Sequence, residues 1–212
     1  MENFCEKKKL VLRDIEEVLR EMNLGITYKS DGEKLLDIFT HIAFAENHMT
    51  ILCSLKEDSD YLNMVAGFHP AAPLKRIGAV NKILKLYNRG PSASGISFPP
   101  FYIPPQENGR VYSRHSLNVR YEGLGVPKDI FKRMIEELII GGYYFYPFVM
   151  KVFKNNLSAK KAFSEFVMHV KKEEENAKNS PPQIVGSFCA ITEQGVGALK
   201  LMFDKYQAVS VK

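Results

Sequence analysis

The sequence has few cysteines and no long apolar run, and each shortage excludes a class of protein. The three cysteines, Cys5, Cys53 and Cys189, are odd in number, lie far apart and have no C-x-x-C spacing. This pattern argues against a disulfide framework and indicates a reducing compartment. No stretch approaches the ~20 apolar residues that a spanning helix needs, and no apolar run follows the N-terminal lysines as a secretory signal would require. We therefore expect a cytoplasmic protein without a membrane partner.

Motifs that mark catalytic, phosphate and metal sites are also missing. No G-x-S-x-G is present, and the G-x-G fragments at residues 123–125 and 195–197 do not continue into a P-loop or a full dinucleotide-binding motif. No two histidines have the H-x-x-x-H spacing of a metal site. The histidines are His41, His48, His69, His115 and His169. We therefore expect no enzymatic activity, no catalytic residue, no metal and no cofactor.

The composition is that of a folded domain. Of the 212 residues, 45% are hydrophobic and 25% are charged, which is enough to fill a core and to keep the surface soluble. Lysine and arginine number 29 against 24 aspartates and glutamates, so the formal net charge is +5. Since the two signs are interspersed, this charge permits anionic partners but does not require one.

The N-terminal part reads as a helix followed by an antiparallel meander. Apolar residues recur at three and four over residues 7–23, the period of an amphipathic helix, and Gly25 offers a left-handed stop. Three apolar runs with short polar turns between them predict three antiparallel strands. The runs are residues 34–44, 49–55 and 61–68. The first of them is ambiguous between helix and strand, and we favour a strand.

The next part reads as a helix, two strands and a long helix. Residues 73–87 have helical apolar spacing, and the Pro-rich residues 98–105 predict an edge strand, because proline cannot donate to a ladder. Residues 110–121 follow a hairpin signal, and apolar and polar residues alternate along them. This pattern predicts a strand with one solvent-exposed face. Residues 127–153 carry a continuous helical stripe that has to cover a sheet or another helix.

Two features interrupt that long helix, and a C-terminal extension follows it. Gly141 and Gly142 fit a site where another backbone approaches closely, and Pro147 should kink or divide the helix. Ser158 should cap a further helix that becomes solvated over residues 171–182, and the apolar tail after it has no readable role. We expect an α+β fold in which helices cover an antiparallel sheet. In chain order the sheet would consist of a three-strand meander and, after an intervening helix, two further strands. The domain would span residues 1–155, and residues 156–212 would form a helical extension that packs on the domain or on a partner.

This order of elements, with three local motifs, resembles the YbjN family, whose fold is like that of type III secretion chaperones. The motifs are V-N-K-I-L-K-L-Y-N at residues 80–88, N-G-R-V-Y-S-R at residues 108–114 and Y-Y-F-Y-P-F-V-M-K-V at residues 143–152. The resemblance covers roughly residues 8–155. It implies a bacterial binding or regulatory domain, often dimeric, described as a regulator of sensory transduction or stress. It brings no catalytic residues with it.

A run of aromatic residues near Pro147 is the first candidate site. Five aromatics in six positions are too many for one helical stripe, so some should lie off the core face and bind a protein partner or a second copy. The competing interpretation is that the helix after Ser158 folds back and covers them. The candidate interface consists of Tyr143, Tyr144, Phe145, Tyr146 and Phe148.

A single-stranded nucleic-acid face is the alternative. Sheets that expose arginines and aromatics bind single strands by charge and base stacking. The candidate residues are Arg110, Arg114, Arg120, Phe101 and Tyr102. No RNP-like motif accompanies them. We therefore favour the competing interpretation, in which these arginines keep an open face soluble while the aromatics fill a sheet edge.

Overall fold

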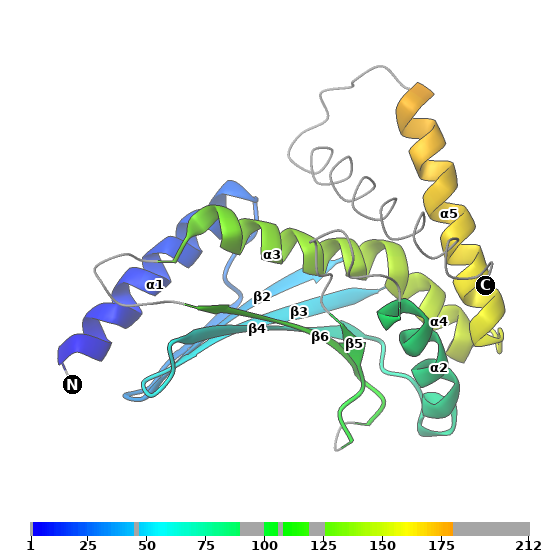
Figure 1. Ribbon diagram of the computed structural model, residues 1–212. Coiled ribbons are helices and arrows are strands. Elements are labelled where there is room, and N and C mark those ends of the chain that lie inside the picture. Colours follow the sequence, from blue (N-terminus) through cyan, green and yellow to red (C-terminus); the bar gives the residue numbers. More distant parts are fainter. Residues whose placement is uncertain (1, 45–46, 90–99, 106–107, 119–125, 180–212) are drawn as a thin grey trace. The chain divides into compact units, whose positions relative to one another are not determined.

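The computed structural model describes residues 2–44, 47–89, 100–105, 108–118 and 126–179, and Figure 1 shows their arrangement. The fold is α+β, as expected. In chain order the elements are α1 (Glu2–Glu21), β1 (Tyr28–Asp31), β2 (Leu35–Ala43), β3 (His48–Lys56), β4 (Tyr61–His69), the 3-10 helix η1 (Leu74–Arg76), α2 (Ile77–Asn88), β5 (Phe101–Tyr102), β6 (Val111–Asn118), α3 (Lys128–Ile140), the π-helix η2 (Gly141–Phe145), α4 (Tyr146–Lys154) and α5 (Ala159–Asn179).

The strands form one open antiparallel sheet in the order β1-β2-β3-β4-β6-β5. The meander of β2, β3 and β4 confirms the three predicted strands, and β5 stands at the sheet edge, as the Pro-rich segment around it predicted. Strand β1 was not predicted. It has only four residues, and its last two belong to a sequence that reads as a turn.

Contacts along the chain define two compact units, and each is built from two segments. Unit 1 consists of Met1–Pro70 and Tyr112–Leu138, and unit 2 consists of Ala71–Val111 and Ile139–Lys212. These units differ from the expected division into a domain of residues 1–155 and an extension of residues 156–212. That expected division stays a prediction.

Unit 1 buries one face of its strands beneath two helices. Figure 1 shows α1 and α3 on the same side of the sheet. Alternate residues of β2, β3 and β4 are buried on that side, and the register sets Leu36 against Leu55 and Ile38 against Cys53. Each fully buried aliphatic side chain stabilises the fold by about 1.5–3 kcal/mol. The strict alternation leaves the opposite face to the intervening residues.

The ends of α1 and α3 are fixed by specific contacts. Asn23, with φ of 56°, is the left-handed residue that ends α1, and the N–H of Leu24 reaches the carbonyl oxygen of Leu19 at 2.7 Å. The helix therefore ends within the predicted stop at residues 23–25, but the left-handed residue is Asn23 and not Gly25. At the start of α3, the carboxylate oxygen Oδ2 of buried Asp14 accepts the N–H of Val126 at 2.9 Å. This hydrogen bond ties the segment before α3 to α1.

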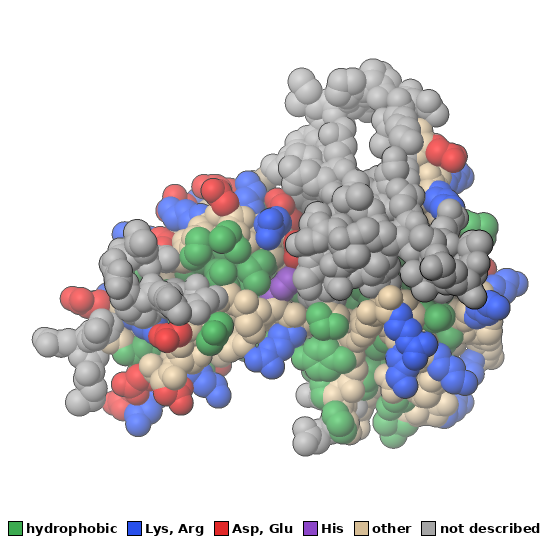
Figure 2. Space-filling view, viewed as in Figure 1, with side chains coloured by type: hydrophobic (Ala, Val, Ile, Leu, Met, Phe, Trp, Pro, Cys, Tyr) green, Lys and Arg blue, Asp and Glu red, His purple; other side chains and the backbone are tan. Residues whose placement is uncertain are grey.

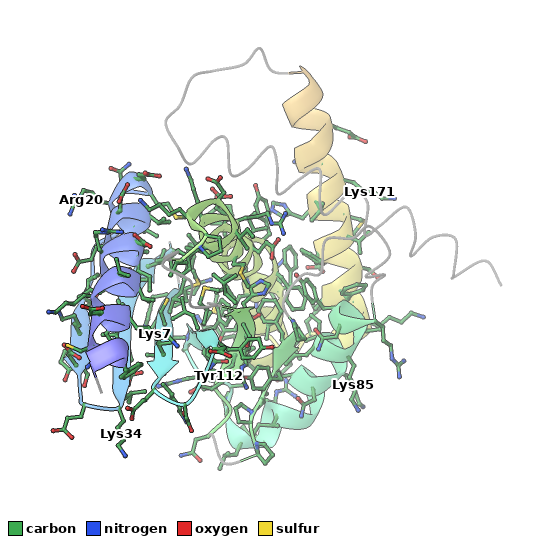
Figure 3. All side chains as sticks on the ribbon, turned by 60° about the vertical axis from the view of Figure 1, so that its left-hand side comes forward. Lys7, Arg20, Lys34, Lys85, Tyr112 and Lys171 are labelled. Carbon is green, nitrogen blue, oxygen red and sulfur yellow. The ribbon has the colours of Figure 1, made fainter. Side chains whose placement is uncertain are left out.

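A lysine lies inside unit 1. This residue is Lys7 of α1, which Figure 3 labels. Its ammonium group donates to the carbonyl oxygen of Ser59 at 3.2 Å and lies 4.0 Å from the carboxylate of Asp60. Burial lowers the pKa of Lys7, and the charge of Asp60 opposes that shift. The lysine thus joins α1 to the turn between β3 and β4.

Unit 2 is a helical cluster with an aromatic centre. The rings of Tyr87 and Phe145 stack with centroids 4.1 Å apart, and Phe101 and Phe166 each lie 5.1 Å from Phe145. These four rings come from α2, η2, β5 and α5. Aromatic pairs at such distances add about 0.5–1.5 kcal/mol each beyond the burial of their area.

The long predicted helix is divided by the π-helix η2 rather than by a simple kink. The N–H of Tyr146 bonds to the carbonyl oxygen of Gly141, five residues earlier, and Pro147 then begins α4. A Cβ at Gly141 would lie 2.8 Å from Cζ of Phe101. The glycine is therefore explained by the approach of an aromatic ring, and not by the second backbone that we expected.

Helix α5 begins as predicted and extends further. The Ser158 hydroxyl accepts the N–H of Lys161 at 3.3 Å, so Ser158 is the cap. The helix continues to Asn179, through most of the segment expected to be solvated and loosely ordered. The tail after residue 179 lies outside the described residues.

Candidate functional site

The face of β1–β4 that points away from α1 and α3 is the candidate site, and we call it the open face. No described helix of unit 1 lies against it in Figure 1. Except for Gly67, its residues are half-buried or exposed, whereas their neighbours in β2–β4 are buried. The open face consists of Tyr28, Ser30, Leu35, Asp37, Phe39, His41, Ala43, His48, Thr50, Leu52, Ser54, Lys56, Tyr61, Asn63, Val65, Gly67 and His69.

An apolar row crosses the middle of the open face. The register sets Tyr28 beside Phe39, Phe39 beside Leu52, and Leu52 beside Val65. The rings of Tyr28 and Phe39 lie 5.6 Å apart, and Tyr28 remains 60% exposed. Large apolar side chains left partly wet across several strands favour association with another surface.

A polar row runs parallel to the apolar row on one side. It consists of Ser30, Asp37, Ser54 and Asn63, which are cross-strand neighbours. The amide oxygen of Asn63 accepts hydrogen bonds from Arg114 at 2.7 Å and from Ser116 at 2.9 Å, both on β6. Asp37 makes no hydrogen bond or ion pair within the described part of the chain.

Histidines occupy the other side of the apolar row. The ring of His48 stacks on that of His69 with centroids 4.5 Å apart, and the ring of His41 lies 4.9 Å from that of His48. Nδ1 of His41 lies 3.3 Å from the hydroxyl of Thr50. The rings stack rather than converge, and over the described residues no group of three or more His, Cys, Asp or Glu is arranged to hold a metal ion.

Sequence reasoning located none of the open face as a site. The alternation of the three predicted strands and their short turns contained the signal, because turn length fixes which residues become neighbours across strands. His48 and His69, for example, are direct cross-strand partners. Without the register, they read only as isolated histidines.

The structure places most of the predicted aromatic interface in the interior of unit 2. Tyr143 is 49% exposed, whereas Tyr144, Phe145, Tyr146 and Phe148 are buried. Helix α5 covers them, with Phe166 5.6 Å from Phe148 between ring centroids. Burial also raises the pKa of Tyr146 well above its ordinary value. Four of the five residues are therefore core residues of the folded chain, and of the five only Tyr143 is substantially exposed.

The predicted nucleic-acid face is not assembled as expected. Phe101 is buried in unit 2 and cannot stack on a base, and Tyr102 and Arg110 are half-buried. Arg114 is exposed, but its guanidinium is bound to Asn63. Arg120 lies outside the described residues. The stacking part of this hypothesis is wrong for Phe101, because the ring fills the space above Gly141.

One pair of titratable groups meets beneath α3 in unit 1. Nε2 of His115 lies 2.9 Å from Oε2 of Glu137, at ion-pair distance but without hydrogen-bond alignment, and Arg133 lies 3.7 Å from the same carboxylate. Burial, with a smaller contribution from Glu137, raises the pKa of neighbouring Glu136, and Lys132 opposes that shift. The pair of His115 and Glu137 is mostly buried, and we interpret it as a contact that fixes α3 on β6.

A shallow cavity of about 400 Å³ lies elsewhere in unit 1. It is lined by Phe4, Cys5, Lys8, Glu33, Lys34 and Glu57. The ammonium of Lys8 is held by the carboxylate of Asp31 at 2.6 Å and the carbonyl oxygen of Gly32 at 2.7 Å. Of the two lysines that line the cavity, Lys8 is thus already paired with residues 31 and 32.

No family model, curated protein or solved structure matches the chain. The resemblance to the YbjN family therefore stays a prediction. Within the described residues, no helix combines the length and the apolar character needed to cross a membrane.

Proposed function

We propose that the protein is a non-catalytic protein-binding or regulatory domain, chaperone-like in fold, and that the open face of unit 1 is its binding surface. The observation that carries this proposal is the apolar row of Tyr28, Phe39, Leu52 and Val65, on the side of the sheet that no described helix of unit 1 covers. The resemblance to the YbjN family, with its role in signalling or stress, supports the same class of function.

The open face has the composition of a protein interface. Interfaces combine an apolar centre with a polar rim, and the apolar row lies between the polar row and the histidines. Burying apolar surface contributes about 25 cal/mol per Å² removed from water. The rim of hydroxyls, amides and imidazoles adds directional hydrogen bonds that select the partner.

The test is a comparison of two charge insertions in unit 1. Leu52→Asp places a carboxylate at the centre of the apolar row. Ile130→Asp is the matched control, because Ile130 is an exposed apolar residue of α3 outside the open face. Both proteins should fold. In quantitative affinity capture, proteins retained by the wild type should be retained by Ile130→Asp and lost with Leu52→Asp. If Leu52→Asp retains the same set, the open face is not the binding surface.

A second candidate function, binding of a nucleic-acid strand, has one observation in its favour. Helix α2 exposes Lys82, Lys85 and Arg89, whose spacing of three and four places them on one side, and residues 74–89 contain no acidic residue. Figure 2 shows basic side chains gathered on part of the visible surface. Binding through phosphates would weaken steeply with salt, and Lys82→Glu with Lys85→Glu should abolish it. Unchanged binding by that double variant would remove this candidate.

A further inference from the structure

The open face has an internal symmetry about its apolar row. On β2, Asp37 and His41 lie two residues to either side of Phe39, and on β3, Ser54 and Thr50 flank Leu52 in the same way. Residues two apart on a strand share a face, so all of these side chains project from the open face. One side of the row therefore carries an acid with a hydroxyl neighbour, and the other carries an imidazole with a hydroxyl neighbour.

Within one chain the acid and the imidazole cannot meet. Asp37 and His41 are four residues apart on an extended strand, which separates them by about 13 Å. His41 contacts Thr50 and the ring of His48, while Asp37 makes no hydrogen bond or ion pair within the described residues. The two groups are complementary, but only a second molecule can join them.

We propose that the occupant of the open face is a second copy of this chain, related by a twofold axis along the apolar row. This rotation lays the row on its own copy and places Asp37 of each chain opposite His41 of the other. It also sets Ser54 opposite Thr50. Twofold symmetry makes such a contact self-complementary, so every pair occurs twice. This inference rests on the proposed function of the open face.

The spacing of packed sheets fits the pair. Sheets that pack face to face lie about 10 Å apart, with their strands within about 30° of each other. The side chain of an aspartate on one sheet and that of a histidine on the other are together long enough to cross this gap. They can then form one hydrogen bond between them. Since the pairs lie only two residues from the axis, the twist between the sheets displaces them little.

The alternative twofold axis, along the strands through Leu52, leaves the carboxylate of Asp37 and the imidazole of His41 unpaired with each other. It would set Asp37 opposite Asn63 and His41 opposite Gly67, according to the register. Asn63 already accepts hydrogen bonds from Arg114 and Ser116. The pairing of carboxylate with imidazole therefore selects the axis along the apolar row.

Two single substitutions and their mixture test this pairing by sedimentation equilibrium. Asp37→His alone sets imidazole against imidazole in the dimer, and His41→Asp alone sets carboxylate against carboxylate. Each should dissociate about tenfold more readily than the wild type. An equimolar mixture of the two variants restores both acid–imidazole pairs between unlike chains, so it should dimerise nearly as tightly as the wild type.

The possible outcomes separate this inference from the function on which it rests. A monomeric wild type, unchanged single variants or a mixture no tighter than its components would overturn the pairing. If capture of other proteins still depends on Leu52 in that case, the open face remains a binding surface for a different partner. Should either variant fail to fold, Asp37→Asn and His41→Gln remove the carboxylate and the imidazole at nearly constant size, and each should weaken the dimer.

Discussion

The side-chain amide of Asn88 pairs with both backbone groups of Phe101. Its Nδ2 donates to the carbonyl oxygen of Phe101 at 2.7 Å, and its Oδ1 accepts the N–H of Phe101 at 3.0 Å. The amide thus acts as one residue of a neighbouring strand and fixes β5 beside α2. Asn88 is also the last residue of one of the motifs on which the predicted resemblance to the YbjN family rests.

Asn88→Ala should destabilise unit 2 by about 1–3 kcal/mol, because a backbone donor and acceptor lose their partners. Asn88→Asp keeps the acceptor and loses the donor, so its cost should be smaller than that of the alanine variant. The control is Lys85→Ala on the same helix, where Figure 3 labels an exposed lysine. Urea unfolding measures all three, and equal midpoints for Asn88→Ala and Lys85→Ala would contradict the role of the amide.

Gly141→Ala should destabilise the protein by about 1–3 kcal/mol through overpacking. The new Cβ would lie 2.8 Å from the ring of Phe101, which is held by Asn88 and its aromatic neighbours. Gly78→Ala in α2 is the matched control, since nothing lies within 4 Å of its added Cβ. The control should be neutral or stabilising by up to about 1 kcal/mol, as expected for a helical Gly-to-Ala change. Thermal unfolding that ranks the two variants the other way would refute the close contact.

How much of this could be predicted differs between the units. Strands β2, β3 and β4 of unit 1 were predicted because each alternates with a period of two, a local signal. The site was not, because the proximity of His41, His48 and His69 depends on register. In unit 2 the aromatic run was conspicuous, but helical periodicity does not say which helix covers it. Only the alternative hypothesis placed Phe101 on an exposed face. Its actual partners, Asn88 and Gly141, could not be predicted because both lie far from it in sequence.

Stability should fall with alkaline pH through Cys53. Burial raises the pKa of its thiol from 9.0 to about 12, so the folded state holds the neutral form. This contribution is fully present below about pH 9 and is lost as the pH rises towards 12. Urea midpoints should therefore decline over this range, and less steeply in Cys53→Ala. Parallel declines in the two proteins would show that Cys53 does not cause the loss.

The central claim is that the open face binds protein, with a second copy of the chain as its occupant. Sedimentation equilibrium on the wild type, Leu52→Asp and Ile130→Asp tests it most directly. The account predicts dimers for the wild type and for Ile130→Asp, and a monomer for Leu52→Asp. A Leu52→Asp protein that dimerises as tightly as the wild type would contradict it.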